Sequence, residues 1–301
     1  MEKKLLLSIV VPVYNCEEKI NKTLSSIAPQ LNRDVELIIV NDGSIDDSLN
    51  IVNSLVKDIN NIKVYSIENQ GALIARKIGT EKATGKYIWY VDGGDEINES
   101  SIDKIIKNIH EHDDADMFYL NHTTIREDNN IEYHKENINN INDPKQILIG
   151  RLPLSLCFRV IKRELLVNCS AYSIKEKLTL LEDGCVSIGA TLKAKKSYLI
   201  DEYLYQYNRE ADSQSNSLSG YKSLIIALDF IYKMVKNNYP MYSEEVDYFV
   251  FTNTIMKILL NNTKEYGKDL YNCYINKQIK NNKYIKMKHI CEFFAKIKVK
   301  Q

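Results

Sequence analysis

The first 110 residues of this 301-residue chain alternate between short apolar runs and amphipathic helical patterns. The spacing of apolar side chains predicts helices over residues 46–57, 72–82 and 102–110. The predicted strands are the apolar runs at residues 5–13, 35–40, 62–67, 87–91 and 117–120. Because short strands that alternate with helices form βαβ units, the pattern predicts an α/β fold with a mainly parallel sheet flanked by helices.

Polar clusters follow four of these predicted strands, at residues 14–15, 41–44, 69–71 and 92–95. The carboxyl ends of parallel strands meet at one edge of a sheet, and ligands of open α/β sheets bind beyond that edge. We therefore expect the four polar clusters to form one site. No internal repeat or long low-complexity linker interrupts the chain.

Charge and cysteine content exclude several classes of protein. Forty basic residues balance forty acidic ones, so no overall positive field attracts nucleic acid. The six cysteines form no CxxC pair and no zinc-ligand pattern, which is typical of a reducing cytoplasm. The apolar run near the N-terminus is broken by Pro12 and is predicted to be a buried strand rather than a signal peptide. No apolar run approaches the roughly 18 residues that a transmembrane helix needs.

Four motifs in order carry a family resemblance: S-I-V-V-P-V-Y-N at 8–15, V-N-D-G-S-I-D-D at 40–47, E-N-Q-G-A-L-I-A-R-K-I-G at 68–79 and A-T-G-K-Y-I-W-Y-V-D-G-G-D at 83–95. With L-E-D-G-C at 181–185, the chain resembles the inverting family 2 glycosyltransferases, which have the GT-A fold. The resemblance implies a nucleotide-sugar donor site in the first 110 residues and an acceptor region that extends to about residue 217.

The resemblance also implies roles for residues of the first three motifs. Asp42 matches the aspartate that contacts uracil, and Pro12 and Tyr14 match positions that line the base pocket. Gly71 and Arg76 belong to the third motif and are expected near the donor. Asp42 has a second interpretation as a turn-forming residue. Arg76 has three: it pairs with a site carboxylate, binds a phosphate, or is solvated.

The fourth motif departs from the family pattern Asp-x-Asp-Asp, because Gly94 occupies the third position. In the family that position supplies a carboxylate to a divalent metal on the diphosphate. Asp92 matches the residue that faces the ribose, with Gly93 beside it, and Asp95 is the nearest replacement ligand. We predict Mn²⁺ or Mg²⁺ held by Asp95 and Asp92, because hard cations prefer oxygen ligands. The alternatives are stabilisation of the leaving group by lysine or arginine without a metal, and an aspartate-rich turn that has no chemical role.

Two later segments complete the predicted site. Glu182 and Asp183 match an E-D pair whose aspartate is the general base that deprotonates the acceptor hydroxyl. Their structural alternative is to complement the N-terminus of a helix. Arg209 lies in an aromatic, basic and serine-rich segment that resembles a family segment which closes over the diphosphate, so it is the predicted phosphate clamp. An exposed surface loop is the alternative.

Residues 272–301 contain eight lysines and one acid, interleaved with aromatic and aliphatic residues. A basic amphipathic helix of this kind binds anionic membranes, and a helix that caps its own protein is the alternative. The lysines are Lys277, Lys280, Lys283, Lys286, Lys288, Lys296, Lys298 and Lys300. We therefore expect a cytoplasmic protein that lies peripherally on the inner face of the cell membrane.

Together these features predict a GT-A domain over residues 1–217 and a helical C-terminal region over 218–301. The GT-A domain divides into nucleotide-sugar binding at 1–110 and an acceptor region at 111–217. The predicted reaction moves a hexose or N-acetylhexosamine from a UDP-sugar to a hydroxyl of a surface glycan or lipid-linked oligosaccharide, as in polysaccharide, lipopolysaccharide or capsule biosynthesis. The alternatives are a non-catalytic protein of the same fold and a nucleotidyltransferase.

Overall fold

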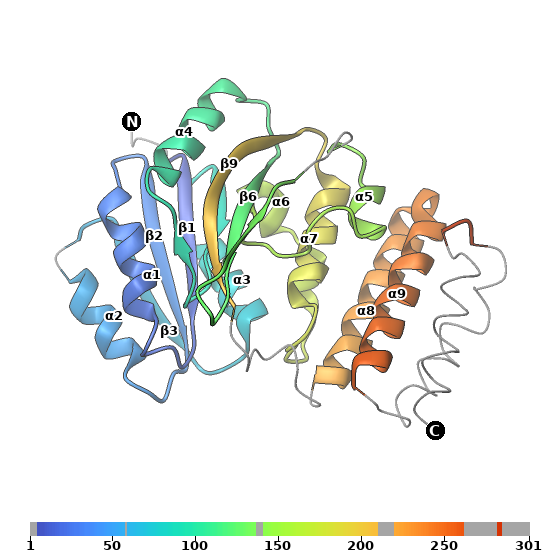
Figure 1. Cartoon of the computed structure of the whole chain (residues 1–301), viewed down its shortest axis with the longest axis horizontal. Coiled ribbons are helices and arrows are strands. Elements are labelled where there is room, and N and C mark those ends of the chain that lie inside the picture. Colours follow the sequence, from blue (N-terminus) through green and yellow to red (C-terminus); the bar gives the residue numbers. More distant parts are fainter. Residues whose placement is uncertain (1–4, 58, 137–140, 210–219, 262–281, 285–301) are drawn as a thin grey trace.

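The computed structural model describes residues 5–57, 59–136, 141–209, 220–261 and 282–284. Within these ranges a nine-stranded sheet forms the centre of the molecule, and helices flank it (Figure 1). The strands are β1 (Leu7–Val13), β2 (Val35–Asp42), β3 (Ile62–Ile67), β4 (Tyr87–Tyr90), β5 (Glu96–Ile97), β6 (Met117–Ile125), β7 (Ile131–His134), β8 (Arg159–Lys162) and β9 (Ser197–Asn208).

The helices connect the strands in the first part of the chain and follow them in the last part. They are α1 (Ile20–Ile27), α2 (Ser48–Val56), α3 (Ala72–Lys82), α4 (Ser101–Glu111), α5 (Lys145–Leu148), α6 (Arg163–Val167), α7 (Glu182–Lys193), α8 (Gly220–Asn238) and α9 (Ser243–Asn261). Short 3₁₀ turns occur at Ala28–Gln30, Ser170–Ser173 and Pro240–Tyr242.

The sheet is parallel in its first half and mixed beyond it. Its strand order is β3-β2-β1-β4-β8-β6-β9-β5, with β7 paired to β6. The strands β1 to β4 pair in parallel, as the βαβ pattern predicts, whereas β8 is antiparallel to both of its neighbours. The sequence pattern did not reveal β5 and β8, because β5 has two residues and β8 lies inside a longer apolar run. The whole sheet is therefore mixed rather than mainly parallel.

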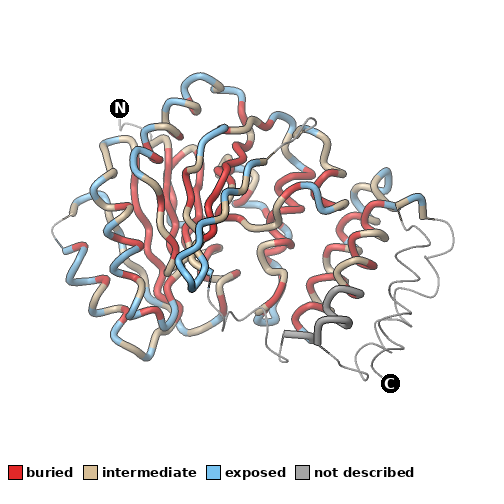
Figure 2. The backbone as a smooth tube through the Cα atoms, viewed as in Figure 1, coloured by how far each residue is buried: buried red, intermediate tan, exposed pale blue. Residues whose placement is uncertain are grey.

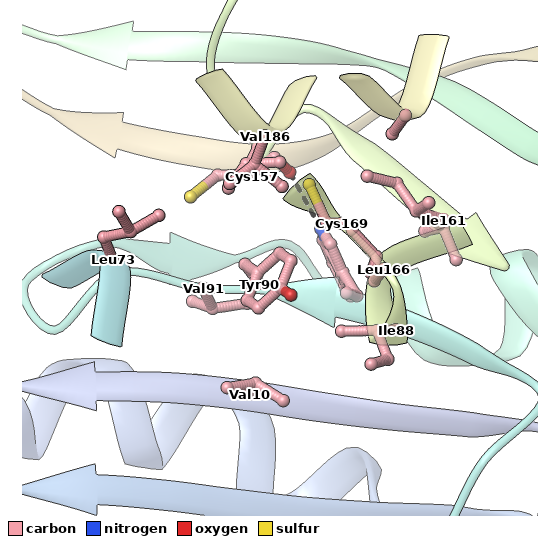
Figure 3. Close-up of a cluster of buried hydrophobic side chains, with 14 of the residues drawn as sticks. Val10, Leu73, Ile88, Tyr90, Val91, Cys157, Ile161, Leu166, Cys169 and Val186 are labelled. Atoms are coloured by element: carbon pink, nitrogen blue, oxygen red, sulfur yellow. Dashed lines mark hydrogen bonds between the residues drawn. The ribbon is translucent and has the colours of Figure 1, made fainter. Parts of the chain in front are cut away.

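The core lies between this sheet and its helices. Figure 2 shows the central strands buried along their length, and every residue of β2 is buried. In Figure 3, Val10 of β1 and Ile88 of β4 lie across from Leu166 and Val186 of the helices α6 and α7. The helix α3 approaches β1 so closely that a Cβ atom at Gly79 would lie 2.3 Å from Cγ1 of Val10. Glycine at this position therefore permits the packing that fixes α3 over the strands.

The C-terminal helices continue this packing, because α8 contacts both α7 and α9. The predicted boundary at 217/218 lies outside the described residues, so the division into domains stays a prediction. Most of residues 272–301 also lie outside them. In the described piece, Lys283 forms a 2.8 Å ion pair with Glu244, and the Tyr284 hydroxyl donates a 2.7 Å hydrogen bond to Glu245. In the part of the chain that the structure describes, no helix combines the length and apolar character needed to cross a membrane.

A buried carboxylate ties the amino-terminal ends of the parallel strands together. Glu36 at the start of β2 accepts hydrogen bonds from Ser8 and from the backbone and hydroxyl of Thr84, each of 2.7 Å. Lys63 of β3 donates to its other oxygen at 2.9 Å. Burial alone would raise the pKa of Glu36, but the hydrogen bonds from Lys63, Thr84 and Ser8 lower it below its usual value. The polar residues at this edge of the sheet therefore stabilise the fold.

The variant Glu36→Gln removes the charge and keeps the volume of the side chain. We expect the free energy of unfolding to fall by about 1–3 kcal/mol near neutral pH, because charge-assisted hydrogen bonds are the stronger kind. Since the folded pKa is lowered, this stabilisation is present above the ordinary glutamate pKa of about 4.3 and is lost as the pH falls through the folded value. Urea unfolding of wild type and variant should therefore converge in acid.

Glu111→Gln on α4 is the matched control, because the side chain of Glu111 is 52% exposed and its ion pair is superficial. An equal loss of stability in both variants would contradict the structural role of Glu36.

Candidate active site

The opposite edge of the sheet, where the parallel strands end, surrounds a cavity of about 360 Å³. We call it the Asp42 cavity, after the last residue of β2. Most residues that the sequence predicts for the site line it. They are Pro12, Tyr14, Asp42, Gly71, Arg76, Asp92, Gly93, Asp95 and Glu182. The polar clusters at the strand ends therefore do converge.

Asp42 has a structural task within this cavity. Its two carboxylate oxygens accept hydrogen bonds of 2.8 Å from the backbone amides of Gln70 and Gly71. These bonds join the end of β2 to the start of α3, where Gly71 adopts a φ of 92°. A carboxylate oxygen can accept more than one hydrogen bond, so Asp42 retains capacity for a ligand. Its turn-forming and ligand-facing interpretations are therefore compatible.

Two lysines that the sequence analysis did not single out also line the Asp42 cavity. Lys177 holds its ammonium 5.7 Å from the centre of the half-exposed Tyr14 ring and contacts Asn69. Lys19 comes from the turn before α1 and lies beside Gly94. They bring positive charge to a cavity whose other charged residues are mostly carboxylates, which suits a phosphate-containing ligand.

Arg76 links the carboxylates of the site. Its side chain is 4% exposed, and Nη2 lies 2.7 Å from Oδ1 of Asp92 at the end of β4. Its Nη1 lies 2.7 Å from Oδ1 of Asp183 and 3.6 Å from Oε1 of Glu182, both on the first turn of α7. The contact with Asp183 lacks hydrogen-bond alignment, so it is electrostatic. Arg76 thus pairs with site carboxylates and is not solvated, and its binding of a phosphate stays a prediction.

A strained turn presents the carboxylates of α7. Leu181, directly before the helix, has a φ of 63°, which a leucine rarely adopts. Its side chain folds over Gly184, where a Cβ atom would lie 2.7 Å from Cδ1 of Leu181. The glycine of the L-E-D-G-C motif therefore accommodates the turn that directs Glu182 and Asp183 into the site.

Asp183 has the electrostatics of a base. Burial raises the pKa of its carboxyl group to about 7, the charge of Arg76 opposes this, and the charges of Glu182 and Asp92 add to it. The backbone amide of Leu156 donates a 3.3 Å hydrogen bond to Oδ2. An acid with this pKa is partly ionised at neutral pH and basic enough to take a proton from a bound hydroxyl.

Asp95 is held by the strand β9, not presented to the cavity as an uncommitted ligand. The Tyr205 hydroxyl donates a 2.6 Å hydrogen bond to Oδ2, and the backbone amide of Asn208 donates one of 2.9 Å to Oδ1. A metal at Asp95 would compete with both bonds. The carboxylate of Asp92 is more accessible to a metal, since its side chain is 40% exposed, although Arg76 already contacts its Oδ1.

Gly94 stands in a turn that other residues rarely form. Its φ is 131°, and its amide donates a 2.9 Å hydrogen bond to the hydroxyl of Thr23. The side-chain amide of Asn208 donates to its carbonyl at 2.8 Å. Glycine at this position therefore loses a carboxylate and at the same time permits a backbone conformation that other residues rarely adopt.

The structure does not place Arg209 in the site. Arg209 is exposed at the end of β9, and its amide donates a hydrogen bond to the carbonyl of Ile125. It lines neither the Asp42 cavity nor the second cavity described next. The phosphate clamp at Arg209 therefore stays a prediction that neither cavity supports. Lys19 and Lys177, by contrast, line the Asp42 cavity.

A second cavity of about 590 Å³ adjoins the first, and we call it the His122 cavity. Asp92, Asp95 and Glu182 line both cavities, whereas Asp183 lines only this one of the two. The His122 cavity is also lined by His122, Thr124, His134, Phe158 and Tyr207. Tyr207 belongs to the aromatic segment before Arg209, whereas the other four carry no sequence motif and come together only in the folded sheet, where His122 pairs opposite His134.

Comparison with known proteins agrees with this geometry. The family model described as "Glycosyl transferase family 2" matches residues 8–173. An uncharacterised glycosyltransferase of Haemophilus influenzae is 39% identical over 100 residues, which are 33% of this chain and 40% of that protein. The cholesterol galactosyltransferase of Borreliella burgdorferi is 26% identical over 235 residues, which are 72% of this chain and 63% of that protein. The chain thus spans less than two thirds of these relatives' length.

Solved structures show the same fold. Residues 1–349 of TarS from S. aureus, in complex with UDP-GlcNAc, superpose with a TM-score of 0.64 and 19% identity, covering 92% of this chain and 93% of that one. The complex of TarS with UDP gives a TM-score of 0.59 over 89% of each chain, again at 19% identity. GT-A glycosyltransferases generally use a divalent metal. Because the family model covers more than half of its length, this chain belongs to glycosyltransferase family 2, and it has the GT-A fold.

Proposed function

We propose that this protein is an inverting glycosyltransferase that moves a hexose or N-acetylhexosamine from a UDP-sugar to a hydroxyl of a surface glycan or lipid-linked oligosaccharide. The observation that carries the proposal is the position of Asp183. Its carboxylate, with a pKa of about 7, lines the His122 cavity beside Glu182, which lines both cavities. A base in this position can act on one substrate while the other occupies the Asp42 cavity.

The Asp42 cavity is the proposed donor site. The carboxylate of Asp42 accepts a hydrogen bond from the uracil imide, and Pro12 and Tyr14 flank the base. Lys19 and Lys177 stabilise the negative charge of the diphosphate. UDP-GlcNAc and UDP are bound in the two TarS structures, which supports a uridine nucleotide as donor.

The reaction then needs one displacement. Asp183 takes the proton of the acceptor hydroxyl, whose oxygen attacks the anomeric carbon opposite the diphosphate. The bond from that carbon to the diphosphate breaks, UDP leaves, and the configuration inverts. Arg76 holds Asp183 and Asp92 in fixed relation, so the base and the donor cavity keep their alignment.

A divalent metal, Mn²⁺ or Mg²⁺, is part of the proposal. In the described residues, no three or more histidine, cysteine, aspartate or glutamate side chains are grouped so that they could hold a metal ion together. A cation on a diphosphate needs only one or two protein carboxylates, since the phosphates supply the remaining oxygens. Asp92 fits that role, and Asp95 positions the loop through Tyr205 and Asn208. When bound, the metal supplies positive charge to the leaving diphosphate.

Asp183→Asn should lower the rate of transfer by about 10²–10⁴-fold, because an amide cannot accept the proton. The affinity for UDP should stay within about twofold, as Asp183 does not line the Asp42 cavity. The measurements are UDP release from UDP-GlcNAc, UDP-glucose and UDP-galactose with a panel of glycan acceptors, and calorimetry of UDP binding.

In the wild type, kcat/KM should fall about tenfold per pH unit below pH 7, where Asp183 becomes protonated.

Asp103→Asn, an exposed substitution on α4, is the matched control and should change neither quantity. Wild-type turnover in Asp183→Asn would remove this residue from the mechanism. UDP binding without turnover in the wild type, for every donor and acceptor, would favour the non-catalytic alternative. Release of diphosphate from a sugar phosphate and UTP would identify a nucleotidyltransferase.

Excess chelator should stop transfer, and Mn²⁺ should restore it. In Asp92→Asn the Mn²⁺ concentration for half-maximal activity should rise about tenfold or more, because the site loses its exposed carboxylate. Asp95→Asn should leave that concentration near the wild-type value and lower thermal stability instead. A larger rise in Asp95→Asn than in Asp92→Asn would return the metal to Asp95. Full activity in chelator would assign the diphosphate charge to Lys19 and Lys177.

We also propose peripheral membrane association through residues 272–301, on the basis of their lysine-rich, amphipathic sequence. Each lysine near an anionic surface contributes about 1 kcal/mol. The full-length protein should sediment with phosphatidylglycerol vesicles but not with phosphatidylcholine vesicles, and high salt should release it. No sedimentation with either vesicle would favour the capping interpretation, to which the ion pair between Lys283 and Glu244 already belongs.

A further inference from the structure

One face of α7 carries a row of three polar side chains. Asp183, Ser187 and Thr191 follow one another at intervals of four residues, which places them on the same face of the helix. Ser187 is fully buried and Thr191 is nearly so, and therefore this face packs against the protein and not against solvent. The segment 153–159 forms a hydrogen bond with each of the three side chains.

The first two side chains of the row hold this segment beside the proposed base. The backbone amide of Leu156 donates its 3.3 Å hydrogen bond to Oδ2 of Asp183. One helical turn later, the hydroxyl of Ser187 donates a hydrogen bond of 2.6 Å to the carbonyl of Leu154. Since Nη1 of Arg76 lies 2.7 Å from Oδ1 of Asp183, each oxygen of the carboxylate has a fixed neighbour. The orientation of the base thus depends on where the segment places the Leu156 amide.

Arg159 connects the far end of the row to the same segment. Its guanidinium donates from Nη1 to the hydroxyl of Thr191 at 3.3 Å and from Nη2 to the carbonyl of Pro153. Its Cζ atom lies 5.1 Å from the centre of the Tyr119 ring. One side chain therefore joins α7 to the beginning of the segment that carries the Leu156 amide.

The burial of Arg159 destabilises the protein unless its donors are used. The residue is 0% exposed, and within the described residues its Nε has no hydrogen-bond partner. Burial lowers the pKa of Arg159, and interactions with Tyr119, Asp183 and Glu136 oppose this fall. An apolar side chain of similar length would avoid the desolvation of a charge. The two hydrogen bonds that Arg159 donates are therefore the feature that an apolar residue could not supply.

We propose that Arg159 is a positioning residue that holds the Leu156 amide in place and thereby orients the carboxylate of the proposed base. Ser187 shares this task, because its hydroxyl holds the same segment. Neither residue lines either of the two cavities, so both act through Asp183 and not by contact with a substrate. This inference rests on the proposed function, because it names the residues that position its base.

The principal variant is Arg159→Met, which keeps a long side chain and removes the donors. The kcat for sugar transfer should fall about 10–100-fold, because a small displacement of a catalytic group is costly, while the affinity for UDP stays within about twofold. Arg159→Lys keeps the charge but lacks the planar fork that reaches both partners, so its kcat should lie between those of the wild type and Arg159→Met. UDP release and calorimetry of UDP binding measure the two quantities.

Ser187→Ala tests the same segment with a small substitution, which covers the case in which Arg159→Met fails to fold. Its kcat should fall about 3–10-fold, as expected for one lost hydrogen bond. Ser101→Ala is the matched control, because Ser101 is also fully buried on a helix and donates its hydroxyl to a carbonyl, that of Leu204, at 3.0 Å. This control should lose similar stability and keep the wild-type kcat.

Two further measurements separate positioning from general damage to the fold. In the Asp183→Asn background, Arg159→Met and Ser187→Ala should lower the residual rate by less than about twofold, since the group that they position no longer accepts a proton. Hydrogen exchange of the Leu156 amide, followed by NMR, needs no turnover. It should be faster in Arg159→Met and Ser187→Ala than in the wild type, and unchanged in Ser101→Ala.

Three results would overturn the proposal: wild-type kcat in Arg159→Met and Ser187→Ala, an equal loss of kcat in Ser101→Ala, or the full loss repeated in the Asp183→Asn background. Failure of the proposed function gives a different result, because the wild type itself then shows no turnover that depends on Asp183. In that case, hydrogen exchange still decides whether Arg159 and Ser187 hold the Leu156 amide.

Discussion

The site depends on one buried cation. Arg76 reaches from α3 to Asp92 at the end of β4 and to Glu182 and Asp183 at the start of α7. A buried guanidinium costs free energy unless it is paired, and the three partly buried carboxylates supply that pairing, so the position of Arg76 depends on all of them. This mutual dependence fixes the strand edge, α3 and α7 in one arrangement. It also explains why these elements, distant in sequence, present their side chains to adjoining cavities.

The same network sets the basicity of Asp183. Burial and two neighbouring carboxylates raise its pKa, and Arg76 limits the rise to about 7. Without the cation, the pKa of Asp183 would be higher, and a smaller fraction of the acid would be ionised and able to accept a proton. Without the burial, it would be too weak a base to take one from a hydroxyl. The arginine therefore does more than hold the loop in place, because it tunes the group that the proposed reaction needs.

The sequence predicted the residues that lie at strand ends, but it did not reveal the contacts that depend on strand pairing. Asp42, Asp92 and Glu182 converge because parallel strands end at one edge and α7 begins there, and both features can be read from the chain. Asp95 was predicted as a metal ligand, but its partner Tyr205 lies 110 residues later on β9. Arg209 follows a matching segment and is nevertheless exposed. His122 belongs to no motif, and only the register of β6 against β7 places it opposite His134.

The glycine in the family motif shows how the backbone conformation of a turn affects the contacts of the side chains around it. Gly94 adopts a φ of 131°, and the turn it permits lets Asn208 bind both its carbonyl and the carboxylate of Asp95. A larger residue would strain this turn, so the loop that loses one carboxylate also commits another to β9. Under the proposed function, the partly exposed Asp92 would hold the metal, and Lys19 and Lys177 would add positive charge beside the diphosphate of the donor.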